Sequence, residues 1–215
     1  RPNESVAFNP ADGYLYFGDD VGGGSNASTV ADDLYKINPA TMNPNPMLVT
    51  NPTLVGTITG LGEECRYVDG LEFTSGGKLY TVDGSDDKLY ELNIATGAII
   101  AIADNNINGG LAGSVDVETI VWDPITNKLI GTDNSGSHRF VEITIGSDGA
   151  NVAQGTFSPG TPGLPTDVDF EGSALYGICS CVITVTSATP TACASNLYNL
   201  AVVVTYSGSP GGNIT

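Results

Sequence analysis

The sequence predicts an all-β protein, because one pattern of short apolar segments recurs four times along its 215 residues. Each repeat opens with an apolar segment that ends in an aromatic residue, and two Leu-Tyr-type segments follow it. The closing aromatics are Phe8, Phe73, Trp122 and Phe170, at intervals of roughly 50 to 65 residues. Repeats of about 40–50 residues that each hold several strands are typical of a β-propeller. We therefore predict a four-bladed β-propeller with four antiparallel strands per blade.

The first two strands of each blade, here called a and b, are joined by a turn signal. Turns rich in Asn, Asp, Gly and Pro separate them, and these residues adopt the backbone angles that hairpins require. The segments assigned to strand a are 5–8, 70–73, 119–122 and 167–170. The segments assigned to strand b are 14–19, 78–83, 128–133 and 174–179.

The third and fourth strands, c and d, complete each blade. Apolar alternation predicts strand c with one buried face at 34–37, 89–92, 140–143 and 197–200. Apolar runs predict strand d around 54–59, 98–103, 152–157 and 201–206. We expect one propeller over 1–206, with blades at about 1–60, 61–113, 114–163 and 164–206 and a Gly/Ser-rich tail at 207–215. The alternative is four blades of a larger ring, completed by further sequence or by another copy.

The charge balance of the chain restricts its partners. Asp and Glu number 24 against seven Lys and Arg, for a formal net charge of −17. Such a surface repels nucleic acid and anionic membranes, so we expect neither as a partner. The sequence contains no apolar run of about 18 residues, so we expect no membrane span.

Several features indicate an extracellular or cell-surface protein. Charged residues make up only 14%, and four cysteines suit two disulfides in an oxidising compartment. These cysteines are Cys65, Cys179, Cys181 and Cys193, with three connectivities open. Glycosylation sequons, which matter only in a secreted glycoprotein, occur at Asn3, Asn26 and Asn213. Because Arg1 opens almost directly into the first repeat, we also expect a processed or trimmed form of a longer precursor.

Two segments resemble a known class of repeat. LYKINPATM at 34–42 and LYELNIATG at 89–97 are similar to the repeats of secreted NHL and YVTN propellers, which include lactonase-like enzymes. The likeness covers most of the chain at the level of the repeat and implies the propeller fold. The fourth repeat departs from it, since Cys179 stands where the others have Asp19, Asp83 and Asp133. Function does not follow, because propellers host many unrelated activities.

Four carboxylates at the start of strand a form the predicted metal site. They are Glu4, Asp69, Glu118 and Asp167. Equivalent positions of a propeller meet around its axis, and like charges held close call for a compensating cation. Calcium prefers oxygen ligands, and in lactonase-like propellers a Glu at this position is a metal ligand. The alternative is that these acids cap turns. A second set, Asp19, Asp83 and Asp133, ends strand b and is expected to accept hydrogen bonds from the following loop.

The sequence assigns no catalytic residue. Its one histidine, His138, lies in a loop, which excludes a zinc site built on two or more histidines. A nucleophile elbow and a phosphate-binding loop are both missing. Carboxylates are plentiful, so a glycosidase pair stays open, although nothing singles one out.

The outermost strands carry uncharged apolar runs at 98–103 and 200–206. Such runs fit burial on both faces, either by packing between blades or by docking on another copy. The predicted interface residues are Ile99, Ile100, Val202, Val203 and Val204. We favour a non-enzymatic structural, assembly or adhesion protein, such as a subunit of a surface layer or filament, that binds calcium. The alternatives are a calcium-dependent lactonase-like hydrolase using the acidic ring, and a carbohydrate-binding module with Tyr14, Tyr67 and Tyr206 stacking on sugars.

Overall fold

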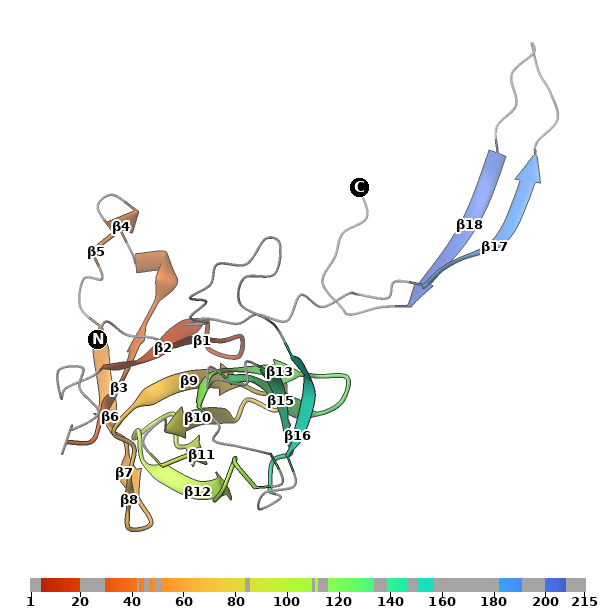
Figure 1. Ribbon diagram of the computed structural model, residues 1–215. Helices are drawn as coiled ribbons and strands as arrows, with labels where there is room; N and C mark the ends of the chain where they lie inside the picture. The colour runs from red at the N-terminus through yellow and green to blue at the C-terminus, as the bar shows by residue number, and fades with distance from the viewer. Residues whose placement is uncertain are drawn as a thin grey trace. The chain divides into compact units, whose positions relative to one another are not determined.

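The computed structural model describes residues 5–19, 30–41, 43–44, 47–48, 52–83, 86–109, 111, 116–133, 139–146, 151–156, 182–190 and 200–207. In this part of the chain the fold is all-β, with one short 3-10 turn at Pro39–Thr41 (Figure 1). None of the described helical segments is long and apolar enough to cross a membrane. The chain divides into two compact units, Arg1–Leu175 and Tyr176–Thr215.

The first unit contains three four-stranded antiparallel sheets, and each is one blade (Figure 1). Blade 1 consists of β1 (Val6–Asn9), β2 (Tyr14–Asp19), β3 (Asp33–Ile37) and β6 (Thr53–Thr57). Blade 2 consists of β9 (Val68–Phe73), β10 (Leu79–Asp83), β11 (Lys88–Leu92) and β12 (Ile99–Asp104). Blade 3 consists of β13 (Val117–Asp123), β14 (Lys128–Asp133), β15 (Arg139–Ile143) and β16 (Val152–Thr156).

These blades confirm the predicted all-β fold of four antiparallel strands per blade. In each, the strands run in the order a, b, c, d, with neighbours in sequence paired in space. The turn chemistry explains the tight a–b connections, because Gly13, Gly77 and Asn127 all adopt the positive φ that these turns require. The total of four blades stays a prediction, since the segments 167–170 and 174–179 lie outside the described residues.

Two small hairpins were not predicted from the sequence. The first joins β4 (Asn43–Pro44) to β5 (Met47–Leu48), and the second joins β7 (Thr59–Gly60) to β8 (Glu63–Glu64). The second turns at Leu61 and Gly62, which both have positive φ. Two consecutive positive φ values are the geometry of a type I′ hairpin turn. This hairpin connects blade 1 to blade 2.

The a strands are neighbours: β9 lies between β1 and β13. Their approach is close at Gly70, where an added Cβ would lie 2.9 Å from the backbone N of Ile120 on β13. Only glycine fits such a contact without displacing backbone. The a strands therefore form the inner layer from which the blades extend outward.

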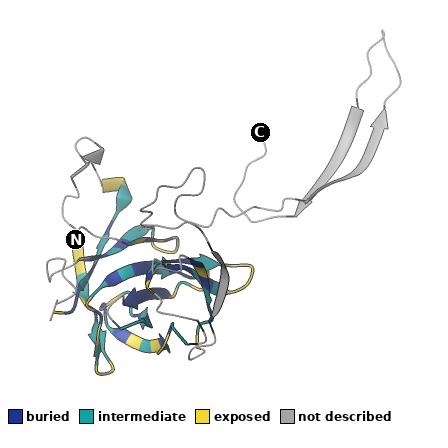
Figure 2. Cartoon of the chain, viewed as in Figure 1, coloured by how far each residue is buried: buried dark blue, intermediate teal, exposed yellow. Residues whose placement is uncertain are grey.

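The core consists of two apolar layers, each between successive blades, which appear as the dark residues in Figure 2. The first layer joins blades 1 and 2, and includes an edge-to-face contact of Tyr16 with Phe73 at 5.3 Å between ring centroids. The second layer joins blades 2 and 3 and contains Tyr80, Ile120 and Val141. Blade-to-blade packing, rather than a single central core, holds this unit together.

The second unit contains a hairpin of β17 (Val182–Pro190) and β18 (Leu200–Ser207), paired antiparallel. The sequence analysis divided 197–206 between two strands, but the structure has one continuous strand from Leu200 to Ser207. The physical reason is that no Gly, Pro, Asn or Asp interrupts LAVVVTYS, so nothing turns the chain there.

Candidate functional site

The candidate site lies where strands a begin and strands b end, which is where the predicted metal ligands belong. The structure describes Asp69 and Glu118, and both are half-buried. The pairing of β9 with β10 skips Asp69, and the pairing of β13 with β14 skips Glu118. Each is thus the extra residue of a β-bulge, a feature that redirects side chains and is frequent beside active sites. Two of the four predicted positions therefore share one special backbone geometry.

The other two predicted ligands, Glu4 and Asp167, lie outside the described residues. Within the described ranges no group of three or more His, Cys, Asp or Glu side chains is arranged to hold a metal ion. The calcium ring accordingly stays a prediction.

The second acidic set supports the backbone around these bulges. Asp83 Oδ2 accepts a hydrogen bond from Arg66 N at 2.9 Å, and Asp133 Oδ1 accepts one from Asp116 N at 2.9 Å. Both aspartates are fully buried, and both donors lie in the segment that leads into strand a. The carboxylates at the end of strand b thus hold, by hydrogen bonds to its backbone, the segment that precedes strand a. The Asp19 side chain lies outside the described part.

A buried ion pair stabilises the same end of blade 3. Arg139 Nε lies 2.7 Å from Asp133 Oδ2, and both side chains are almost inaccessible to water. Removing one partner of such a pair leaves an uncompensated charge in a poorly solvated place. Arg139 is therefore best explained as the structural partner of Asp133.

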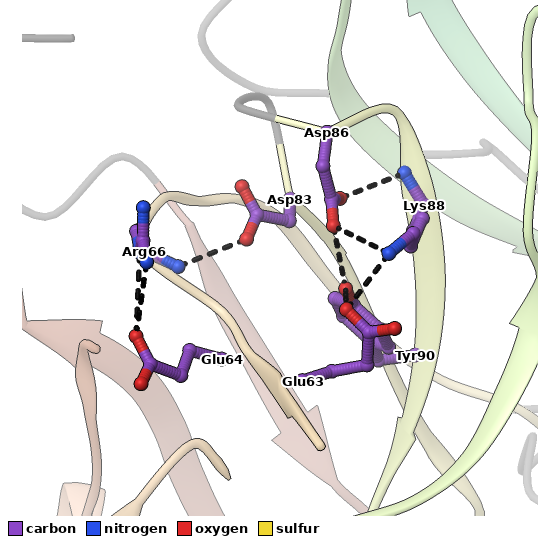
Figure 3. A network of polar contacts seen from close by, with 7 residues as sticks. All are labelled: Glu63, Glu64, Arg66, Asp83, Asp86, Lys88 and Tyr90. Atoms are coloured by element: carbon purple, nitrogen blue, oxygen red, sulfur yellow. Dashed lines mark hydrogen bonds and ion pairs between the residues drawn. The ribbon is translucent and has the colours of Figure 1, made fainter. Parts of the chain in front are cut away.

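A polar network surrounds the β7–β8 hairpin (Figure 3). Lys88 Nζ contacts Glu63 Oε2 at 2.7 Å and Asp86 Oδ2 at 3.2 Å, while the Tyr90 hydroxyl donates to Asp86 Oδ2 at 2.7 Å. The hydrogen bond from Lys88 lowers the pKa of Glu63, and the bond to Glu63 raises the pKa of Lys88. Burial, and then the bond to Asp86, raise the pKa of Tyr90. Lys88 thus compensates only part of the negative charge of Glu63 and Asp86, and its bond to Glu63 ties the β7–β8 hairpin to blade 2.

Cys65 lies next to this network and is fully buried, with a free thiol in the structure. Burial, and then the negative charges of Asp83 and Asp32, raise its pKa. A thiol in such surroundings is a poor nucleophile. The predicted disulfides stay a prediction, because Cys179, Cys181 and Cys193 lie outside the described residues.

Glu72, an acid that lies between blades 2 and 3, is not among the site residues predicted from the sequence. Burial raises the pKa of Glu72 to about 7, although a backbone hydrogen bond from Trp122 opposes the change. The equivalent positions hold Ala7 in blade 1 and Val121 in blade 3, but the fourth repeat has a second acid there, Asp169, one residue before its aromatic. The sequence therefore does not single out Glu72, whose pKa is raised by burial that only the fold reveals.

The predicted outer interface is described in part. On β12, Ile99 is buried, whereas Ile100 and Ile102 are exposed. Strand register pairs Ile99 with Leu92 and Ile102 with Tyr90, so the buried Ile99 and the exposed Ile102 share a face. Packing within the described part of the chain therefore leaves part of this apolar run exposed. The side chains of Val202, Val203 and Val204 on β18 lie outside the described part, as does His138. The sequons at Asn3, Asn26 and Asn213 lie there too, as does the Tyr206 side chain, while Tyr14 and Tyr67 are half-buried.

No model of a known protein family matches the sequence, and no curated protein matches it. Solved β-propeller structures do resemble it. A Bacteroides thetaiotaomicron protein of unknown function has 15% identity and a TM-score of 0.46, over 72% of this chain and 32% of that one. An engineered GH43 glycoside hydrolase has 16% identity and a TM-score of 0.48, over 70% and 27%. The calcium-binding protein regucalcin from Agrobacterium tumefaciens has 18% identity and a TM-score of 0.42, over 68% and 43%.

This chain spans less than half of the length of each of these three proteins. The two of them with a stated function are a glycoside hydrolase and a calcium-binding protein, and the likeness extends to the fold alone.

Proposed function

We propose that this chain is a non-enzymatic structural propeller of an extracellular or cell-surface assembly, and that copies associate through their outer strands. The observation that carries the proposal is a pair of exposed isoleucines on β12, the outer strand of blade 2. On it, Ile100 is 49% exposed and Ile102 is 37% exposed. An outer strand normally carries charge or proline to prevent association, and the run from Ile99 to Ala103 carries neither.

The backbone of β12 favours packing of side chains over pairing with a further strand. The pairing of β11 with β12 skips Ile100 and Ala103, so β12 contains two irregularities. Bulges twist an edge away from further strand pairing. Association through β12 therefore rests on packing of apolar side chains, and Ile100, the more exposed of the two isoleucines, is the central contact.

Other features support an extracellular or cell-surface location. The acidic surface, the cysteines and the sequons suit a secreted glycoprotein, and the bulged carboxylates Asp69 and Glu118 support calcium as a stabilising ion at the inner end of the blades. Calcium in this proposal holds the blades together and takes part in no reaction.

Electron microscopy of the native protein, paired with its mass in solution, tests the proposal. Wild-type protein should form filaments, sheets or discrete oligomers, and the double variant Ile100→Lys/Ile102→Lys should lose them while keeping its circular dichroism spectrum. Ile125→Lys is the matched control, because Ile125 is exposed in the turn between β13 and β14 and away from β12. Dispersed wild-type monomers at high concentration would remove the proposal.

A further inference from the structure

A short loop after β12 ties blade 2 to blade 3. It covers residues 105–109, and its central residue, Ile107, is fully buried in the core layer between the two blades. Asn151, which directly precedes β16 in blade 3, donates from Nδ2 to Asp104 Oδ2 at 2.8 Å and to the carbonyl oxygen of Ile107 at 3.0 Å. A buried side-chain amide of blade 3 therefore holds the backbone of this loop.

The same loop is bonded to Asp87, in the turn between β10 and β11. Ile107 N donates to the carbonyl oxygen of Asp87 at 2.9 Å, and Asn108 Nδ2 donates to Asp87 Oδ2. Asp87 has a positive φ of 56°, which is uncommon for a residue other than glycine. Its contacts with the loop therefore help to hold this turn in its conformation.

The charged groups around Asp87 come from blades 2 and 3. They are Asp86, Lys88, Asp116, Asp133 and Arg139, the ion-pair partner of Asp133. Each of the two cations pairs with one of these acids, and residues 105–109 carry no charge. Burial raises the pKa of Asp87, although the bond from Asn108 opposes this rise, and the negative charges of the three neighbouring aspartates raise it further. A proton on Asp87 removes this repulsion.

The side-chain amide of Asn108 offers a place for that proton. Its oxygen, Oδ1, is buried and has no hydrogen-bond partner among the described residues, while its nitrogen donates to Asp87. A buried acceptor without a donor destabilises the fold. An ionised carboxylate only accepts hydrogen bonds, whereas a protonated one also donates one. Protonated Asp87 can therefore form two hydrogen bonds with this amide, one in each direction.

We propose that Asp87 and Asn108 form a proton-dependent latch, which fastens the loop 105–109 in the seam between blades 2 and 3. In the closed latch the carboxyl O–H of Asp87 donates to Asn108 Oδ1, while Asn108 Nδ2 donates to the other carboxyl oxygen. Loss of the proton leaves Asn108 Oδ1 without its donor and places a negative charge beside three other carboxylates. The loop then opens more readily, and Ile107 leaves the seam with it. This latch is independent of the self-association proposed above.

The direction of the pH dependence follows from the raised pKa of Asp87. The closed loop binds the proton more tightly than the opened loop, in which Asp87 regains a pKa near 3.8. The stabilisation by the latch is therefore complete below that value and is lost as the pH rises through the pKa of the closed state. Between the two pKa values, the equilibrium constant for opening should increase by up to about tenfold for each pH unit.

Hydrogen exchange at the backbone amide of Ile107 tests the proposal, because this N–H is bonded to Asp87 only while the loop is closed. Measurements in a Glu72→Gln background remove the titration of Glu72 from the result. After correction for the intrinsic exchange rate, protection should decrease as the pH rises. Asp87→Asn should abolish this decrease, since an amide at position 87 can accept from Asn108 Nδ2 and donate to Asn108 Oδ1 without titrating. Asn also tolerates positive φ, so the variant should fold.

Asn108→Asp is the opposing variant. It places two carboxyl groups in contact, so protection of the Ile107 amide should be low at neutral pH and should recover only on acidification. Glu64→Gln is the control, because this carboxylate pairs with Arg66 on the surface and should leave the pH profile unchanged.

Each result either supports the latch or overturns it. Protection that decreases with pH in the parent and stays constant in Asp87→Asn supports it. A flat profile in the parent, or the same decrease in Asp87→Asn, overturns it. The carboxyl carbon resonance of Asp87 in the wild type gives a second test that needs no variant. Titration at or below the ordinary value for Asp overturns the proposal, and titration above it that also shifts the side-chain amide resonances of Asn108 supports the latch.

Discussion

Glu72 makes the contact between blades 2 and 3 sensitive to pH, and Glu72→Gln should remove that sensitivity. Burial raises the pKa of this carboxyl from 4.5 to about 7 in the folded chain. The native state therefore binds a proton that the unfolded state has released between pH 4.5 and 7. By linkage, the contribution of Glu72 to stability is greatest below about pH 4.5, falls as the pH rises, and levels off above pH 7.

The size of the effect follows from the pKa change. At about 1.36 kcal/mol for each pH unit, a pKa that moves from 4.5 to about 7 corresponds to roughly 3 kcal/mol. Glu72 is only half-buried and water screens part of its charge, so we expect about 2 kcal/mol. Gln keeps the shape and an oxygen that accepts the Trp122 hydrogen bond but carries no charge. It should match the wild type at about pH 4.5, where the loss has only begun, and exceed its stability by about 2 kcal/mol at pH 8.

Urea denaturation at several pH values between 4.5 and 8.5 measures this difference. The control is Glu64→Gln, which removes a carboxylate whose ion pair with Arg66 is largely exposed, and which should change stability by less than about 1 kcal/mol at every pH. Parallel pH profiles for the wild type and Glu72→Gln would refute the reasoning, because the carboxyl would then titrate alike in the folded and unfolded chain.

Three further predictions concern the interior and the metal. Arg139→Met should cost about 3–5 kcal/mol in urea denaturation, since it leaves the buried Asp133 without its cation. Gly70→Ala should cost about 1–3 kcal/mol, because the new methyl group meets the backbone of β13. Calcium at millimolar concentration should raise the melting temperature, and Asp69→Asn with Glu118→Gln should abolish that rise.

Matched control variants, and a control metal, distinguish these specific effects from a nonspecific change in stability. Lys78→Met removes a cation that is mostly exposed, and should cost far less than the change at Arg139. Gly76→Ala adds a methyl group in a turn where only the Thr74 hydroxyl lies nearby, at 3.8 Å, so it should be tolerated. Magnesium in place of calcium controls for ionic strength. An equal loss of stability in a variant and its control would contradict the corresponding prediction. An equal rise in melting temperature with calcium and with magnesium would contradict the calcium prediction.

The fold was predictable from sequence wherever turn chemistry and periodicity agreed. Strands a, b and c of the first three blades follow from apolar runs bounded by turns such as Asn9–Gly13, where the turn residues specify the hairpin. The β7–β8 hairpin escaped prediction because its strands are two residues long and one turn position is Leu61, a residue that rarely adopts positive φ.

The candidate site was predictable only in part, because its geometry depends on register. Spacing from the strand-a aromatic placed Asp69 and Glu118 at equivalent positions, and both prove to be bulged residues. Spacing does not reveal that Asp83 bonds to the backbone of Arg66, since the two are adjacent only after strands a and b pair. Side-chain partners across a sheet are set by the fold and not by distance along the chain.

The exposed residues of β1 show why repetition hides an interface from sequence patterns. In a repeat protein every unit carries the same apolar positions, so Phe8 looks as buried as Phe73 until the neighbouring blade is in place. The pattern therefore specifies that each face has a partner, and leaves open whether that partner belongs to the same chain or to another copy. Only a measurement that separates contacts within a chain from contacts between chains decides this.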